Sequence, residues 1–554
     1  MRSEAVVAPD HSPKPSVRAL GALVVRHERA AAIVASALLV WLAQFHHAAS
    51  FGLYEDDYFF ISRAMGQDVS YVLARLSVFW TLPQGRPFGF FLPDLLAFVG
   101  DKLGGLGAIY ILGSLIVILN TFLCYSLLRV RVPPAAAACG AAMFCLFPAD
   151  TTKILLTHDF QLQPALTFAL LASLAYTAGR GWLAYLLSAG ALLSYESGFL
   201  ALFALPLLLR RWERPLAREL VRHALILAAL VLLVIVARFA VGEVRAAQSV
   251  GGVGDIIPRL LGSLVLGPLR SVAATLYQPL RVVPGWDAET LVLALIALVA
   301  FAATLWRLAP AAPPRWRSVL EVGGAGLAML ILGYGLAFTH YPPSAIVGRG
   351  TSVHLGATEG MAVLAAAIAW ALLSVRPRLG AALLSAYFAL AVGYYVTIER
   401  DFMRSWQLQR QFWQQVVACC SDVQDGTVLL YELDPNVPTT FIFANSWADP
   451  LVLEQTFRFP SEWRVPPRLF GLTGWRSRVV SEGQRLLWWV PGASWDEHWE
   501  DLPQGNVILL RPASDGRVER VTGNIALDRG TLHLKDLGQP MKWPPAQLYP
   551  YLLN

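Results

Sequence analysis

Charged residues are scarce in this sequence. Only 15% of its 554 residues are Asp, Glu, Lys or Arg, while 56% are hydrophobic and the mean hydropathy is +0.51. Soluble domains typically carry about 25% charged residues, so the composition predicts an integral membrane protein. Cysteine is also rare, with five residues, of which Cys419 and Cys420 are adjacent. A bridge between neighbouring cysteines is strained, so we expect no disulfide framework.

Several motifs that would define other protein classes are missing. The stretch Gly251-Gly252-Val253-Gly254 follows no predicted strand and lacks the lysine of a phosphate-binding loop, which disfavours a nucleotide-sugar donor. Arginine is scattered over short loops, so nucleic acid is not an expected partner. We expect no cleavable signal peptide, because the polar segment 1–29 runs into the apolar segment 30–46 without an evident cleavage site.

Long apolar runs dominate the first 400 residues. A helix needs roughly 20 residues to cross a hydrocarbon core, and eleven segments approach that length. The sequence therefore predicts a polytopic α-helical membrane domain over 30–400 with about eleven transmembrane helices. The predicted spans are 30–46, 106–128, 133–148, 161–178, 182–194, 197–209, 222–241, 287–306, 319–338, 355–374 and 379–397.

The short loops carry arginine unevenly. Loops on the side of the N-terminus hold most of it, which predicts a cytoplasmic N-terminal segment, 1–29, under the positive-inside rule. We therefore expect a multi-pass protein of the inner (plasma) membrane. The long first loop, 47–105, then faces outward, together with the C-terminal segment 401–554.

The sequence pattern predicts secondary structure in two of the outer regions. Apolar residues recur at helical spacing from Val69 to Trp80, which predicts a helix lying along the membrane surface. The segment 401–554 is richer in charge and contains short runs typical of strands. It is predicted to be a soluble α/β or mixed domain on the periplasmic or extracytoplasmic side. The predicted strands are 427–433, 440–444, 506–510 and 531–535.

Three adjacent acids, Glu55, Asp56 and Asp57, follow the first predicted span, with aromatic residues on both sides. Like charges this close repel one another, and a membrane boundary makes their solvation harder. The cluster could serve as a general base, a metal site, a proton relay or a solvated loop. Its oxygens suit a divalent cation, but no second acidic motif stands at suitable spacing, so we expect no required metal or other cofactor.

The arrangement resembles a known family. Paired acids directly after the first span, then a surface helix, then Gln84-Gly85-Arg86-Pro87, are similar to the GT-C superfamily of membrane glycosyltransferases. Protein O-mannosyltransferases and the aminoarabinose transferase of lipid A belong to it. The resemblance covers roughly 30–400. It implies that Asp56 is the general base, with Asp57 second in the motif and Glu55 an additional acid.

The resemblance also implies the reaction. Enzymes of this superfamily take a sugar from a polyprenyl-phosphate carrier in the bilayer. They transfer it to a hydroxyl of a glycan, lipid or protein by a single inverting displacement. A departing phosphate needs a cation, and arginine matches its geometry. Arg349 and Lys153, both in outer loops, are the candidates, although Arg349 could equally pair with a lipid headgroup.

Other polar residues of the outer loops are weaker candidates for substrate binding. Arg86 is expected either to pair with the acidic cluster or to snorkel at the interface. Glu196 stands at a predicted helix break and could line a cavity or cap a helix. His158 shares the Lys153 loop, where a solvated histidine is the simpler reading. His340 and Tyr341 share the loop of Arg349.

Alternative functions remain at this point. A transporter or flippase of lipid-linked sugars would also place acids and cations at a cavity, but it would show related halves and acids deep in several spans. An O-antigen-ligase-like glycan transferase would rely on arginine and histidine more than on paired acids. A structural assembly partner would use the outer domain as its contact surface.

Overall fold

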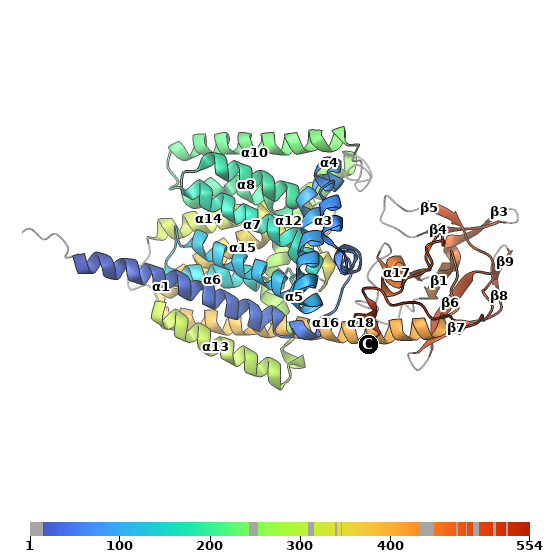
Figure 1. Ribbon diagram of the computed structural model, residues 1–554. Coiled ribbons are helices and arrows are strands. Elements are labelled where there is room, and N and C mark those ends of the chain that lie inside the picture. The colour runs from blue at the N-terminus through green and yellow to red at the C-terminus, as the bar shows by residue number, and fades with distance from the viewer. Residues whose placement is uncertain are drawn as a thin grey trace, which may run out of the picture.

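The structure is a computed structural model with a helical bundle and a strand-containing domain joined by one long helix (Figure 1). It describes residues 15–242, 253–308, 315–337, 341–344, 346–432, 448–472, 475–482, 485–490, 498–513, 517–527 and 530–553.

The bundle confirms a polytopic helical membrane protein. Within the described residues, seven helical segments are long and apolar enough to cross a membrane. Shorter apolar helices lie beside them, so all eleven predicted spans fall on helices. The bundle helices are α1 (Pro15–Val40) with η1 (Trp41–Phe45), α5 (Pro87–Leu128), α6 (Pro134–Cys145), α7 (Leu156–Thr177), α8 (Gly181–Ser194), η5 (Glu196–Ala204) with α9 (Leu205–Leu209), α10 (Pro215–Ala240), α12 (Val253–Arg281), α13 (Ala288–Leu308), α14 (Trp316–Leu332), α15 (Thr358–Val375) and α16 (Pro377–Cys419).

The segment after the first span forms one end of this bundle, which we call the acidic end because it carries Glu55, Asp56 and Asp57. Short helices build it: η2 (Ala48–Ser50), α2 (Asp57–Phe60), η3 (Ser62–Ala64), α3 (Val69–Arg75), α4 (Val78–Thr81) and η4 (Pro83–Gly85). The predicted surface helix is present as α3 and α4. Val69, Leu73 and Trp80 are exposed on it while Val72 is buried, so it offers an apolar face to a membrane surface.

Helix α5 begins earlier than the span predicted from 106. It starts at Pro87, and Gly104 and Gly105 interrupt its helical geometry. The last part of the predicted loop 47–105 is therefore the first half of a kinked helix. Its apolar composition was hidden by the charges and glycines between 101 and 105.

Helix α12 occupies a region that the sequence analysis treated as a loop. It buries polar residues and exposes a stripe of large apolar residues, listed here: Ile257, Leu261, Val265, Leu269, Leu276 and Leu280. Near the end of α10, Arg238 contacts Glu196, which binds Arg86; at the start of α13, Glu289 contacts His46. Both flanks of α12 therefore meet the segment 46–86, so α12 does not carry the chain across the bundle. Its apolar stripe suits contact with lipid.

The C-terminal domain is built on the end of α16. Its main sheet has the order β2-β1-β6-β7, in which β1 is parallel to β2 and β6 while β7 is antiparallel to β6. The predicted strands at 427–433, 506–510 and 531–535 correspond to β1, β6 and β9; residues 440–444 lie outside the described part. The strands are β1 (Val428–Glu432), β2 (Arg468–Leu472), β3 (Val479–Glu482), β4 (Arg485–Val490), β5 (His498–Asp501), β6 (Val507–Pro512), β7 (Val518–Val521), β8 (Asn524–Leu527) and β9 (Gly530–His533).

Helix α16 joins the two parts. Beyond the predicted span, which ends at 397, the helix continues to Cys419, and Figure 1 shows the strand domain on the same side as α3. Just after its end, Arg520 donates to Asp422 in a buried pair, and Gly538 N–H donates to the same carboxylate at 2.8 Å. Burial alone would raise the pKa of Asp422, but these hydrogen bonds outweigh it and lower the pKa. The domain is thus fastened to the helix end.

Candidate active site

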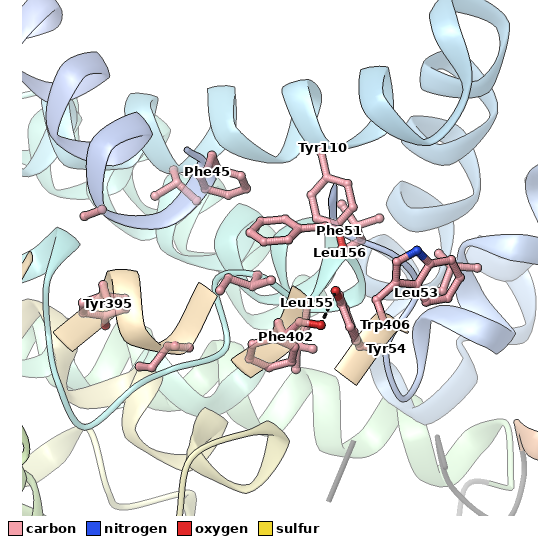
Figure 2. Packing of buried hydrophobic residues seen from close by; sticks show 14 of the residues in the cluster. Phe45, Phe51, Leu53, Tyr54, Tyr110, Leu155, Leu156, Tyr395, Phe402 and Trp406 are labelled. Carbon is pink, nitrogen blue, oxygen red and sulfur yellow. Dashed lines mark hydrogen bonds between the residues drawn. The ribbon is translucent and has the colours of Figure 1, made fainter. Parts of the chain in front are cut away.

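The residues just before the acids are buried in the bundle core (Figure 2). Tyr54 donates its hydroxyl to Phe402 O of α16 at 2.9 Å, and Tyr110 of α5 donates to Gly52 O at 2.8 Å. A Cβ on Gly52 would lie 1.8 Å from Trp406 Cδ2, so only glycine allows the chain this close to α16. The segment that leads into the acids is therefore packed closely against α5 and α16.

Asp57 is fully buried and holds two segments together. Its Oδ1 accepts hydrogen bonds from Thr157 N and Thr157 Oγ1, both at 2.7 Å, and its Oδ2 accepts one from Tyr54 N at 3.2 Å. Thr157 is in the first turn of α7, where Leu155 at the N-cap supplies no side-chain cap. Asp57, which belongs to a different segment of the chain, caps the helix instead. A negative charge is favourable at the N-terminus of a helix. Burial nevertheless raises the pKa of Asp57 to about 7, and the hydrogen bonds from Thr157 oppose that rise.

Asp56 faces a guanidinium instead. Its Oδ2 lies 3.0 Å from Arg349 Nη2, and the Arg349 side chain is 34% exposed while that of Asp56 is 10% exposed. Glu55 precedes the pair in a left-handed backbone conformation, with φ of 51°. Burial raises the pKa of Glu55 to about 7, the charge of Arg349 opposes that rise, and the neighbouring carboxylates add to it. The structure thus brings the three acids and Arg349 together.

Two loops fix the position of Arg349. Gly348, whose φ is 116°, donates its N–H to Thr151 Oγ1 at 3.0 Å, and the hydroxyls of Thr151 and Thr351 lie 2.9 Å apart. Thr351 in turn donates to Gly348 O at 2.7 Å. The loop 149–160, which the sequence analysis expected to face outward as the second outer loop, therefore contacts the loop of Arg349 at the first turn of η8 (Arg349–Ala357).

Lys153 shares this second loop but points elsewhere. It is 2% exposed, and its ammonium donates to Cys145 O at 2.9 Å and to Tyr395 Oη at 3.4 Å. Cys145 is the last residue of α6, so the cation lies at a helix C-terminus, where positive charge is favourable. Within the described part of the chain, neither Asp56 nor Arg349 is a hydrogen-bonding partner of the Lys153 ammonium.

His158 and Asp159 lie beside the cluster, in the first turn of α7. His158 is buried, and the charge of Arg349 acts on its imidazole. Its Nδ1 and both carboxylate oxygens of Asp159 have no hydrogen-bonding partner within the described part of the chain. Buried polar atoms of this kind usually have partners, so this turn is a place where a ligand could supply them.

Arg86 does not pair with the acidic cluster, which corrects one expectation. Its Nε and Nη2 donate to the two oxygens of Glu196 at 2.6 and 2.5 Å, and its guanidinium lies 4.0 Å from the ring centroid of Tyr195. Arg238 also contacts Glu196, at 3.6 Å. The helix does break before Glu196, because Tyr195 is extended. The Glu196 carboxylate at that break binds the guanidinium of Arg86 through two hydrogen bonds, so Arg86 and Glu196 form a structural pair.

The remaining two candidates stand in the loop before Arg349. Tyr341 is partly exposed and its ring packs against Gly262 of α12. His340 lies outside the described residues. The structure thus gives Tyr341 a packing contact and leaves the candidate role of His340 as a prediction.

Asp94 is a buried acid that the sequence analysis did not single out. Asp94 of α5 is fully buried and receives Arg63 at 2.7 and 3.0 Å, Arg75 at 2.6 Å and the hydroxyl of Tyr71 at 3.1 Å. These contacts hold η3 and α3 against α5. The signal was a single acid within an otherwise apolar run, which is costly unless it is paired.

Comparisons with known proteins add one solved structure. No family model matches the chain, and no curated protein sequence matches it significantly. The structure of ArnT from Cupriavidus metallidurans bound to undecaprenyl phosphate is similar over 74% of this chain and 84% of that chain, with 15% identity and a TM-score of 0.36.

Proposed function

We propose that this protein is a glycosyltransferase of the inner membrane, with a periplasmic active site at the acidic end. It would transfer a sugar from a polyprenyl-phosphate donor to an acceptor hydroxyl on a glycan, lipid or protein. The observation that carries the proposal is the pair formed by Asp56 and Arg349, at 3.0 Å. It joins a carboxylate able to take a proton with a cation able to hold a phosphate.

The chemistry divides between these two side chains. Asp56 accepts the proton of the acceptor hydroxyl as its oxygen bonds to the anomeric carbon. The bond between that carbon and the carrier phosphate breaks, and the phosphate leaves with its electron pair. Arg349 stabilises the developing negative charge, for which its forked guanidinium is suited. Before the donor binds, the Arg349 guanidinium contacts the Asp56 carboxylate directly.

The neighbouring residues have supporting roles in this proposal. Asp57 holds the start of α7 against the acidic segment through Thr157. Glu55 and His158 lie near Arg349 and could contact the sugar or the acceptor. Lys153 stays a candidate second cation, but this role requires its ammonium to leave Cys145 O.

The test is sugar transfer by the purified full chain in lipid, supplied with a panel of polyprenyl-phosphate sugars. Asp56→Asn should lower turnover by about 10²–10⁴-fold, the usual contribution of a general base, while donor binding persists. The matched control is Asp68→Asn. Asp68 caps α3 through Tyr71 N at 3.2 Å, and asparagine caps a helix about as well.

Each outcome has a clear meaning. Normal turnover in Asp56→Asn would remove Asp56 from the mechanism and reject the proposed base. Donor binding without transfer in the wild type, across the whole panel, would contradict the enzyme and favour a transporter of lipid-linked sugars.

A further inference from the structure

A second group of chemically active side chains lies away from the Asp56–Arg349 pair. His46 and His47 follow η1 at the end of the first membrane helix, and Glu289 is in the first turn of α13. The Nε2 atoms of both histidines approach the same Glu289 oxygen, Oε1, at 3.1 and 3.2 Å. One ligand atom from each residue lies within 4.8 Å of the other two.

Hydrogen bonds alone account poorly for this arrangement. His47 Nδ1 lies 2.7 Å from Glu399 Oε2, so donation there and to Glu289 requires both of its ring nitrogens to carry protons. His46 would also donate through Nε2, while its buried Nδ1 has no partner in the described part of the chain. Two N–H groups would then converge on one carboxylate oxygen.

A metal ion accounts for the same contacts with neutral imidazoles. Bonds of about 2.0–2.1 Å in a tetrahedral site place two ligand atoms roughly 3.3 Å apart. The two histidine-to-Glu289 separations, 3.1 and 3.2 Å, are close to that value. His47 Nδ1–H then donates to Glu399, which orients the ring as carboxylates do behind metal-binding histidines. Glu399 is fully buried and also accepts the backbone N–H groups of His46 and His47, at 3.1 and 3.3 Å.

We propose that His46, His47 and Glu289 bind a Zn²⁺ ion, with Glu399 as a positioning residue. Two imidazoles and one carboxylate suit zinc better than magnesium or calcium, which prefer oxygen ligands. Arg400 donates to the other oxygen of Glu289, at 2.5 Å, and so leaves Oε1 directed at the histidines. The fourth tetrahedral position is available to water or to an anionic group.

The site would join three segments of the bundle. His46 and His47 belong to the end of the first helix, Glu289 to α13, and Glu399 to α16 just before Phe402, the residue that binds Tyr54. The ion would thus fasten the segment that leads into the acids. This inference does not depend on the proposed transferase activity.

Zinc binding by the purified, chelator-treated full chain tests the inference. Titration against a chromophoric chelator should give one Zn²⁺ per chain. His46→Ala and Glu289→Gln should each weaken binding at least 100-fold, and Glu399→Gln by about 10–100-fold. His498→Ala is the matched control, because His498 is an exposed histidine of β5 in the other domain, and it should bind as the wild type does.

A second measurement guards against a variant that fails to fold. His46→Cys keeps a zinc ligand at this position, so it should retain stoichiometric binding and, with Co²⁺, show a thiolate-to-metal absorption band that the wild type lacks. Wild-type protein without stoichiometric binding would overturn the site. So would unchanged affinity in His46→Ala and Glu289→Gln, or a Co²⁺ spectrum of His46→Cys identical to that of the wild type.

Discussion

Arg349 and Asp56 form an ion pair, with 3.0 Å between Nη2 and Oδ2. Asp56 follows the first membrane helix, whereas Arg349 precedes α15, far along the chain. The contact closes the acidic end over the start of α7. Its partly exposed guanidinium is reachable from outside, whereas the carboxylate is mostly covered. A ligand with a negative group would therefore meet the arginine first.

Removing this guanidinium should impair the proposed transfer. We expect Arg349→Ala to lower turnover by about 10²–10³-fold, the usual loss when one charge-stabilising donor is removed. Arg349→Lys should retain part of the activity, because lysine supplies the charge without the fork. Turnover with a polyprenyl-phosphate sugar measures both, and Arg317→Lys, a change at an exposed arginine, is the control. Equal turnover in Arg349→Ala and the wild type would exclude this role.

Asp57 should make stability depend on pH. Burial raises its pKa from the ordinary value of 3.8 to about 7, so the folded state holds the proton more tightly than the unfolded state. This contribution to stability is complete below pH 4 and is lost as the pH rises through 7. The shift corresponds to about 4 kcal/mol. Thr157 and Tyr54 donate hydrogen bonds to the group, and the carboxyl groups of Glu55, Asp56 and Asp159 lie close enough to interact with it. Burial raises the pKa of Glu55 as well.

Thermal unfolding in detergent between pH 4 and 8 measures this effect. Asp57→Asn should flatten the decline in melting temperature that the wild type shows as the pH rises. Asp101→Asn, a change at an exposed acid that accepts from Gly66 N, should keep the wild-type slope. The same slope in Asp57→Asn would show that another group is responsible.

The pair of Arg86 and Glu196 should be strongly coupled. Both side chains are about one-fifth exposed and form two charge-assisted hydrogen bonds. A double-mutant cycle with Arg86→Met and Glu196→Gln should give a coupling free energy of about 2 kcal/mol. Unfolding by SDS in mixed micelles provides the free energies. A cycle using Arg238→Met should give a smaller value, since Arg238 lies 3.6 Å from Glu196; the reverse order would contradict the assignment.

Asp94 should be required for docking of the surface helix. Asp94→Asn leaves Arg63 and Arg75 without their carboxylate and should destabilise the fold by about 3 kcal/mol, as when one partner of a buried pair is lost. Hydrogen exchange should then rise in 68–81 before it rises in the bundle. Arg75→Lys keeps the charge and should show a milder effect. Unchanged exchange in Asp94→Asn would mean that apolar contacts alone hold α3.

Hydropathy was sufficient to locate the bundle helices, because crossing a membrane requires a long apolar run whatever its neighbours are. The sequence analysis left α12 as a loop because basic residues and three prolines interrupt its apolar run: Pro258, Pro268 and Pro279. It also missed the first half of α5, where Asp94 and the charges and glycines between 101 and 105 interrupt the apolar run. Within the described residues, Asp94 is paired only with residues of other helices.

The acids themselves were recognisable by their crowding, but their individual partners were not. Asp56 and Asp57 are adjacent, yet one contacts Arg349 and the other caps α7. Arg86 was expected beside the acids and instead binds Glu196. Such pairings depend on how segments distant in the sequence pack together, so the local sequence does not predict them.

Helix α16 runs without a break from the membrane region to the strand domain. At about 1.5 Å per residue, its 43 residues span roughly 65 Å. Along the way its Phe402 carbonyl binds Tyr54, and its Gln409 Oε1 accepts from Tyr58 Oη at 2.7 Å. The tyrosines on both sides of the acids thus donate hydrogen bonds to the same helix. The C-terminal end of that helix is held to the strand domain by the pair of Asp422 and Arg520. A force applied to the C-terminal domain would therefore be transmitted along α16 to the acidic segment.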